Sequence, residues 1–152
     1  MSEPVVGVGV ACPALPMWQV RLIRLVTAGY WVSMCVGTHM PNPPDVVPTN
    51  VPDTWLHLGA YFGLSVLLVG SVADRGRLSV LASLRLWAVV LVYGALDEWT
   101  QMIPVLHRTA EWKDFAADAA GSAGGLIFGS VLVRLCPGRL RGGGSGGSGG
   151  DR

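Results

Sequence analysis

The chain has 152 residues and a formal net charge of +1, and only 14% of its residues are charged, against roughly 25% in soluble proteins. Hydrophobic residues make up 51% of the chain, which is typical of a protein that lies largely within a membrane and excludes an ordinary soluble enzyme domain. The balanced charge, without a clustered basic patch, also excludes a general nucleic-acid-binding protein.

Four apolar segments are long enough to cross a bilayer as helices, which takes roughly 20 residues each. They are residues 20–36, 56–72, 86–103 and 115–135. We therefore predict an all-α, polytopic integral membrane protein of about four transmembrane helices. Residues 1–19 are predicted to form an N-terminal cytoplasmic segment, residues 20–135 the membrane domain, and residues 136–152 a flexible tail rich in glycine and serine.

Local signals place the ends of the predicted spans. The first span is expected to be an uncleaved anchor, because no A-x-A cleavage site follows it. A proline-rich stretch over residues 41–52 predicts an extended connection, and Asp53 and Thr54 after it are typical helix N-caps. The third span is predicted to begin at residue 86, so that Arg85 reaches the interface instead of lying in lipid.

Glycines in the fourth predicted span recur at every fourth residue, at positions 121, 125 and 129. Small residues at this spacing allow two helix backbones to approach closely. We therefore expect this face of the fourth helix to be a packing contact. The three cysteines are scattered and without a CxxC motif, so neither a disulfide framework nor a thiolate zinc site is predicted.

Basic residues give the predicted orientation, since Lys and Arg accumulate on the cytoplasmic side of short loops. With both termini in the cytoplasm, nine of the 11 basic residues lie on that side and only Arg108 and Lys113 lie outside. Most acidic residues and all three histidines then lie at or near the outer face. We therefore expect the chemistry of this protein to face outward from the cell membrane.

Polar residues recur at helical spacing near the outer ends of the last three spans. On the second span they lie four residues apart and share one face, and on the third they lie three residues apart at a similar depth. Ionisable groups in or near a bilayer cost several kcal/mol and usually mark a site, a pathway or a paired network. The predicted site residues are Asp53, His57, Tyr61, Glu98, Gln101, Arg108, Asp114 and Asp118.

Each of these residues also has a structural explanation when it is considered alone. Asp53 is then an N-cap, and Arg108 an ion-pair partner for Asp114. Tyr61 and Gln101 would donate hydrogen bonds between helices. Only the combination of all eight residues favours a functional site.

The combination resembles the VanZ-like family of membrane proteins. The resemblance covers residues 53–129, although the family often has Lys where this chain has Thr54 and Asn where it has Asp118. It implies a role in the cell envelope and, from the members that gave the family its name, a link to resistance against the glycopeptide teicoplanin. The matching motifs are Asp53-x-x-x-His57-x-x-x-Tyr61, Tyr93-Gly94-x-x-x-Glu98-x-x-Gln101, Arg108-x-x-x-x-x-Asp114 and Asp118-x-x-Gly121-x-x-x-Gly125.

Two functions of the predicted site remain open. In the first, the protein binds an anionic lipid or glycan intermediate. In the second, it is a membrane-embedded acid/base enzyme, a hydrolase or transferase acting on a lipid-linked headgroup, in which Arg108 grips the phosphate while His57 or Glu98 moves a proton. The other site residues then bind the ligand.

Metal and other cofactors are not predicted. His57, Glu98 and Asp114 are ligand-type residues, but the chain has no HExxH motif and these three include no closely spaced ligand pair. The expected partners are the lipid bilayer and a lipid-linked or glycan small molecule, with no nucleic acid.

Overall fold

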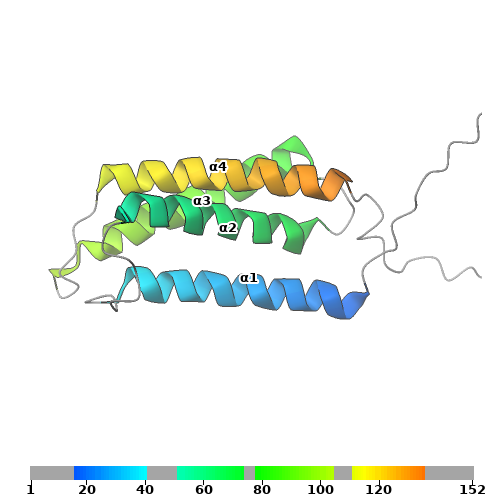
Figure 1. Cartoon of the computed structure of the whole chain (residues 1–152), viewed down its shortest axis with the longest axis horizontal. Helices are drawn as coiled ribbons and strands as arrows, with labels where there is room; N and C mark the ends of the chain where they lie inside the picture. The colour runs from blue at the N-terminus through cyan, green and yellow to red at the C-terminus, as the bar shows by residue number, and fades with distance from the viewer. Residues whose placement is uncertain (1–15, 41–50, 74–77, 105–110, 136–152) are drawn as a thin grey trace, which may run out of the picture.

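The computed structural model describes residues 16–40, 51–73, 78–104 and 111–135. These residues form the helices α1 (Met17–Thr38), α2 (Asp53–Val72), α3 (Val80–Gln101) and α4 (Trp112–Leu135), shown in Figure 1. Each of the four is long and apolar enough to cross a membrane. The predicted fold class, an all-α protein with four membrane-spanning helices, is therefore confirmed.

All four helices begin before the predicted spans, at Met17, Asp53, Val80 and Trp112 instead of residues 20, 56, 86 and 115. The third helix begins at Val80 instead of residue 86, because the Ser79 side chain caps it by accepting a 3.2 Å hydrogen bond from the Ala82 backbone N–H. Arg85 consequently lies within α3, on an exposed face. The N-cap role predicted for Asp53 and Thr54 is wrong, since α2 begins at Asp53 itself, and no side chain caps its first turn.

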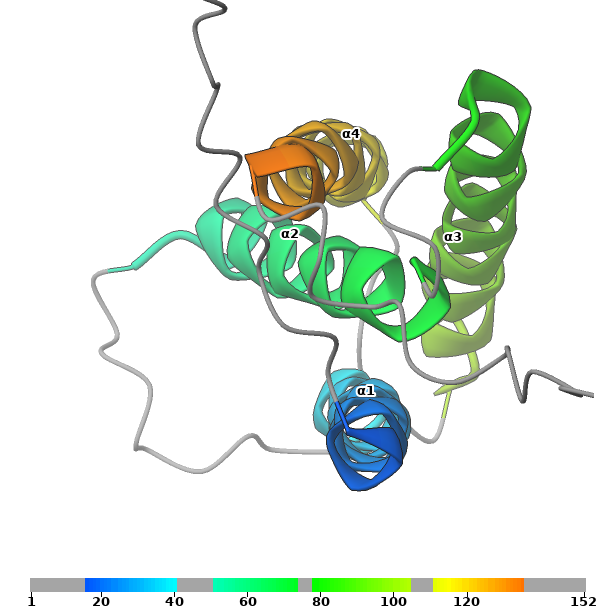
Figure 2. The same ribbon diagram turned by 90° about the vertical axis from the view of Figure 1, so that its right-hand side faces the viewer.

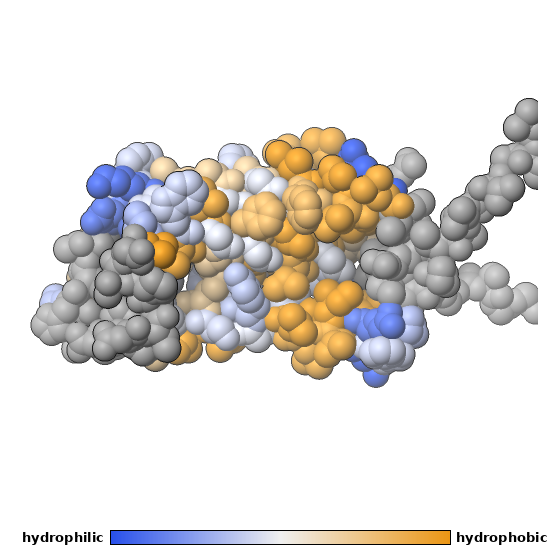
Figure 3. Space-filling model, in the orientation of Figure 1, coloured by the Kyte–Doolittle hydropathy of each residue, from blue (hydrophilic) through white to orange (hydrophobic). Residues whose placement is uncertain are grey.

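Consecutive helices run in opposite directions, as the views in Figures 1 and 2 show. The start of α1 and the end of α4 therefore lie at the same end of the bundle. The last turns of α1 and α3 and the first turns of α2 and α4 lie at the opposite end, which we call the site end. Hydrophilic side chains gather at both ends of the described helices, with apolar side chains between them (Figure 3).

The packing contact predicted from the glycine spacing is confirmed, and it joins α4 to α2. A Cβ atom on Gly121 would collide with the carbonyl oxygen of Leu58, and one on Gly125 with the carbonyl oxygen of Phe62. Further along, a Cβ atom on Gly129 would lie 3.0 Å from Cβ of Val69. Only glycine permits this approach, so α2 and α4 form the central pair of the bundle.

Side-chain hydrogen bonds attach the two outer helices to this pair. On α1, the Thr27 hydroxyl donates to the carbonyl oxygen of Leu67 at 3.3 Å, and the Tyr30 hydroxyl donates to that of Ala60 at 3.0 Å. On α3, the Trp87 indole N–H donates to the Ser122 hydroxyl of α4 at 3.1 Å. These bonds fix how α1 and α3 are rotated, and with that which of their polar side chains face inward at the site end.

Candidate functional site

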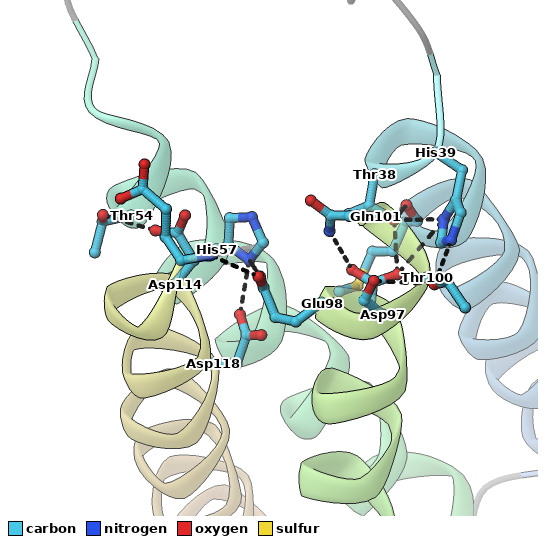
Figure 4. A network of polar contacts seen from close by, with 12 residues as sticks. Thr38, His39, Thr54, His57, Asp97, Glu98, Thr100, Gln101, Asp114 and Asp118 are labelled. Carbon is cyan, nitrogen blue, oxygen red and sulfur yellow. Dashed lines mark hydrogen bonds and ion pairs between the residues drawn. The ribbon is translucent and has the colours of Figure 1, made fainter. Parts of the chain in front are cut away.

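An imidazole of α2 lies between two carboxylates from two other helices at the site end (Figure 4). His57 Nδ1 donates a 2.9 Å hydrogen bond to Oδ1 of Asp118 on α4, and it lies 3.9 Å from Oε1 of Glu98 on α3. The residues are buried, with 5%, 1% and 8% of their surface exposed for His57, Asp118 and Glu98. We call these three residues the inner cluster. His57 and Glu98, which the sequence places at a similar depth on two helices, are therefore close neighbours in the structure.

Two carboxylate oxygens of the inner cluster have no hydrogen-bond partner among the described residues. They are Oε1 of Glu98 and Oδ2 of Asp118. The other Glu98 oxygen, Oε2, accepts a 3.1 Å hydrogen bond from the Glu111 backbone N–H at the start of α4. An unpartnered buried polar atom costs about 1–3 kcal/mol, and more when it is charged, so these two oxygens indicate a site that is completed by a proton, water or ligand.

Tyrosines of α2 and α3 lie directly beneath the inner cluster, on the side toward the middle of the bundle. The Tyr61 ring is nearly parallel to that of His57, with centroids 6.4 Å apart, and the Tyr93 ring lies 5.9 Å from Tyr61. Both hydroxyl groups are buried and unpartnered among the described residues. Tyr61, predicted to bind the ligand, therefore forms the floor of the cluster.

Asp53 and Asp114 lie on the other side of His57, toward the helix starts. The Thr54 hydroxyl donates a 2.8 Å hydrogen bond to Oδ1 of Asp114 and so joins the first turns of α2 and α4. Asp114 is buried, whereas Asp53 is exposed. One ligand atom from each of Asp53, His57 and Asp114 can be chosen so that the three lie within 4.8 Å of one another, and we call Asp53 and Asp114 the outer pair.

Gln101 belongs to a different cluster, which the sequence analysis missed. Its side-chain N–H donates to Oδ2 of Asp97 at 3.0 Å, while the Thr38 hydroxyl of α1 donates to Oδ1 at 2.8 Å. His39 Nδ1 lies 3.6 Å from the same Oδ1, and His39 Nε2 lies 2.7 Å from the Thr100 hydroxyl. Asp97 is 2% exposed and both its oxygens are paired, so this cluster fastens α1 to α3 (Figure 4).

The donor set of the inner cluster could hold a metal ion. One ligand atom from each of His57, Glu98 and Asp118 lies within 4.8 Å of the others, which is compatible with joint coordination after small side-chain rotations. The sequence shows no closely spaced ligand pair because His57, Glu98 and Asp118 come from three helices, and the triad considered from the sequence had Asp114 in place of Asp118.

Of the eight predicted site residues, the structure brings six together, namely His57, the four carboxylate residues Asp53, Glu98, Asp114 and Asp118, and Tyr61 beneath them. Arg108 lies outside the described residues. A scan against protein-family models and searches of curated proteins and of solved structures return no match. The VanZ-like resemblance therefore rests on the motifs of this chain.

Proposed function

We propose that the protein is a VanZ-like envelope protein of the cell membrane and that its site end carries out acid/base chemistry on the headgroup of a lipid or lipid-linked intermediate. The observation that carries this proposal is the position of His57, held at 2.9 Å by one buried carboxylate with a second at 3.9 Å. The motif resemblance implies the role in the cell envelope and the link to glycopeptide resistance.

The proposed acid/base chemistry follows from the different hydrogen-bond partners of the Asp118 and Glu98 carboxylates. Asp118 accepts the Nδ1 proton and so fixes the tautomer and orientation of His57, which leaves Nε2 able to accept a proton from a reacting group. Glu98 is held by the Glu111 backbone N–H through one oxygen only. Its other oxygen is available to give or take a proton. His57 and Glu98 are therefore the proposed catalytic groups.

The site end is proposed to face outward. Among the described residues, Arg21, Arg24 and Arg134 lie at the opposite end, whereas Lys113 lies at the site end. This distribution agrees with the excess of basic residues in cytoplasmic loops. The proposed substrate is consequently a headgroup in the outer leaflet.

Simple binding of an anionic lipid or glycan is the second candidate, and it depends on Arg108. Four carboxylates surround His57, and no Lys or Arg side chain contacts any of them among the described residues. Such a site repels an anionic group unless a cation is added to it. The acidic character of the described site therefore favours proton transfer over anion binding.

Lipids that remain bound through gentle purification test the proposal. The full chain and its Glu98→Gln variant are purified in mild detergent, and the retained lipids are identified by mass spectrometry. The variant should retain an unconverted lipid-linked species that wild type converts when both are incubated with it in vesicles. The control is Glu111→Gln, because the Glu111 side chain is half exposed and faces Lys113; it should behave as wild type.

A binding protein gives a different result. Wild type and Glu98→Gln would then carry the same unconverted lipid in different amounts, and neither would convert it. That outcome contradicts the enzymatic proposal and supports the second candidate.

A further inference from the structure

We propose that the inner cluster, His57, Glu98 and Asp118, binds a divalent metal ion with the preferences of Zn²⁺ or Mn²⁺. The metal site itself is independent of the proposed function. The role of the ion in catalysis, which is to present an anionic headgroup oxygen or a water molecule to the site, rests on that function.

The distances in the inner cluster suit an ion bound between the three side chains. Metal bonds to imidazole nitrogen and carboxylate oxygen are about 2.0–2.2 Å long, so donors in a tetrahedral site lie about 3.4 Å apart. His57 Nδ1 lies 2.9 Å from Asp118 Oδ1 and 3.9 Å from Glu98 Oε1. These two separations lie on either side of the coordinated value, so small rotations of the side chains would make room for the ion.

Charge and unpartnered oxygens point to a cation in the same place. Glu98 and Asp118 bring two carboxylates into a buried site where His57 carries at most one positive charge. Glu98 Oε1 and Asp118 Oδ2 have no hydrogen-bond partner among the described residues, although their residues are more than nine-tenths buried. A divalent ion would neutralise both carboxylates and give these oxygens a ligand.

The surroundings already hold the donors in position, as second-shell groups do in metal sites. Oε2 of Glu98 is fixed by the Glu111 backbone N–H, which leaves Oε1 as the free donor. Asp118 is held against α3 at Gly94, where no side chain intervenes. The three ligands thus come from three helices at one depth.

An imidazole with two carboxylates suits Zn²⁺ and Mn²⁺ better than Mg²⁺ or Ca²⁺, which prefer oxygen ligands alone. Three protein ligands leave a coordination position for water or substrate, as in catalytic metal sites. A divalent ion there would also let the acidic site accept a phosphate oxygen. Coordination through Nδ1 would require His57 to release the Nδ1 proton and to carry its hydrogen on Nε2, so a metal-bound water would supply the acid/base group in place of the imidazole.

Metal binding is measured on the full chain in detergent after removal of metal with a chelator. Equilibrium dialysis against micromolar Zn²⁺ or Mn²⁺, with elemental mass spectrometry, should find one tight site per chain. Glu98→Gln and Asp118→Asn keep the size of the side chains and should each weaken binding at least tenfold. Glu111→Gln removes only an exposed side-chain charge and keeps the backbone N–H, so it should leave binding unchanged. Asp53→Asn, at the outer pair, should still show the tight site.

Two outcomes overturn the inference: wild type without a tight site, or a site lost in Asp53→Asn and retained in Glu98→Gln, which would place the ion at the outer pair. Electron spin echo spectroscopy of wild type with Mn²⁺ gives an independent answer if a variant does not fold, since it detects the imidazole nitrogen. If the tightly bound Mn²⁺ gives no nitrogen signal, the inference is overturned as well. Lipid conversion that persists in metal-free protein refutes the catalytic role of the ion but leaves the proposed function standing.

Discussion

The unpartnered oxygen of Asp118 on α4 faces Gly94 on α3, and a Cβ atom at that glycine would lie 3.2 Å from Oδ2 of Asp118. The same atom would lie 3.4 Å from Cε1 of Tyr61. Gly94 is therefore the position at which α3 comes close enough for Glu98, one turn later, to reach the inner cluster. The space beside Asp118 exists because this residue has no side chain.

Gly94→Ala should disturb the inner cluster while raising local helix propensity. The added methyl group must displace either the Asp118 carboxylate or the Tyr61 ring, and overpacking of this kind costs about 1–3 kcal/mol. Gly59→Ala is the matched control, because a Cβ atom there meets nothing within 4 Å, so only the helix-propensity gain of about 1 kcal/mol acts. In detergent, the melting temperature should fall for Gly94→Ala and hold or rise for Gly59→Ala. Equal changes in the two variants would show that Gly94 is not a packing position.

Gly121→Ala should separate α2 from α4. A methyl group there meets the Leu58 carbonyl oxygen, which is backbone and cannot rotate away, so the two helices must move apart. The expected cost is at least the 1–3 kcal/mol of ordinary overpacking. Gly124→Ala, on the same helix, places its Cβ at a normal 3.5 Å from the Phe62 ring and should be tolerated. Thermal unfolding in detergent compares the two, and equal stability would contradict the glycine contact.

The number and approximate places of the helices could be predicted because apolar length is a local property of the chain. The start of α3 could not be predicted in this way. The expected cost of placing the Arg85 charge in lipid favoured a later start than the one that the Ser79 cap produces. In the structure Arg85 is the sixth residue of α3, close enough to the helix start for its long side chain to extend to the interface. The glycine contact was predictable as a face, but its partner, α2, follows only from three-dimensional packing.

The site could be predicted in part for a related reason. The depth of a residue along a membrane-spanning helix follows from its position in the sequence. On this ground His57 and Glu98 were expected at the same depth, and the structure has them side by side. Rotation about the helix axis does not follow from that position, since neighbouring helical residues point about 100° apart. Glu98 faces His57, whereas Asp97 contacts α1 and Gln101 donates a hydrogen bond to Asp97. The place of Gln101 in the Asp97 cluster therefore could not be predicted from its position in the sequence.

Thr38→Val should weaken the attachment of α1 to α3. It removes the donor of the 2.8 Å hydrogen bond to Oδ1 of the buried Asp97 carboxylate. Losing a hydrogen bond to a charged group costs about 1.5–3 kcal/mol, seen as a lower melting temperature. Ser33→Ala is the control on the same helix, because within the described part of the chain the Ser33 hydroxyl bonds only to its own helix, at the Gly29 carbonyl. If both variants melt alike, the Asp97 cluster does not hold α1 in place.

The orientation of the bundle can be read by labelling single cysteines. In a chain with Cys12, Cys35 and Cys136 replaced, Lys113→Cys lies exposed at the site end, and Arg134→Cys lies exposed at the opposite end. If the site end faces outward, a membrane-impermeant maleimide labels the first variant in intact cells and the second only after permeabilisation. The reverse pattern would place the site in the cytoplasm and contradict an outer-leaflet substrate.

Two substitutions of Asp118, to Asn and to Leu, should distinguish its contribution to folding stability from its role in metal binding. Asp118→Asn keeps an oxygen that can accept the His57 Nδ1–H and replaces the unpartnered, charged Oδ2 by a neutral amide. The melting temperature of the metal-free protein should therefore change little, even though the variant loses a metal ligand.

Asp118→Leu removes the hydrogen bond as well as the charge and leaves the buried His57 donor without its partner, at a cost of about 1–3 kcal/mol. Its melting temperature should fall clearly below that of Asp118→Asn. Both variants should fail to gain stability from added Zn²⁺, whereas wild type gains it because the ion binds only the folded state. If Asp118→Asn is as unstable as Asp118→Leu without metal, the carboxylate charge is itself needed for folding. That result would contradict the assignment of Asp118 as a metal ligand whose charge can be removed without loss of stability.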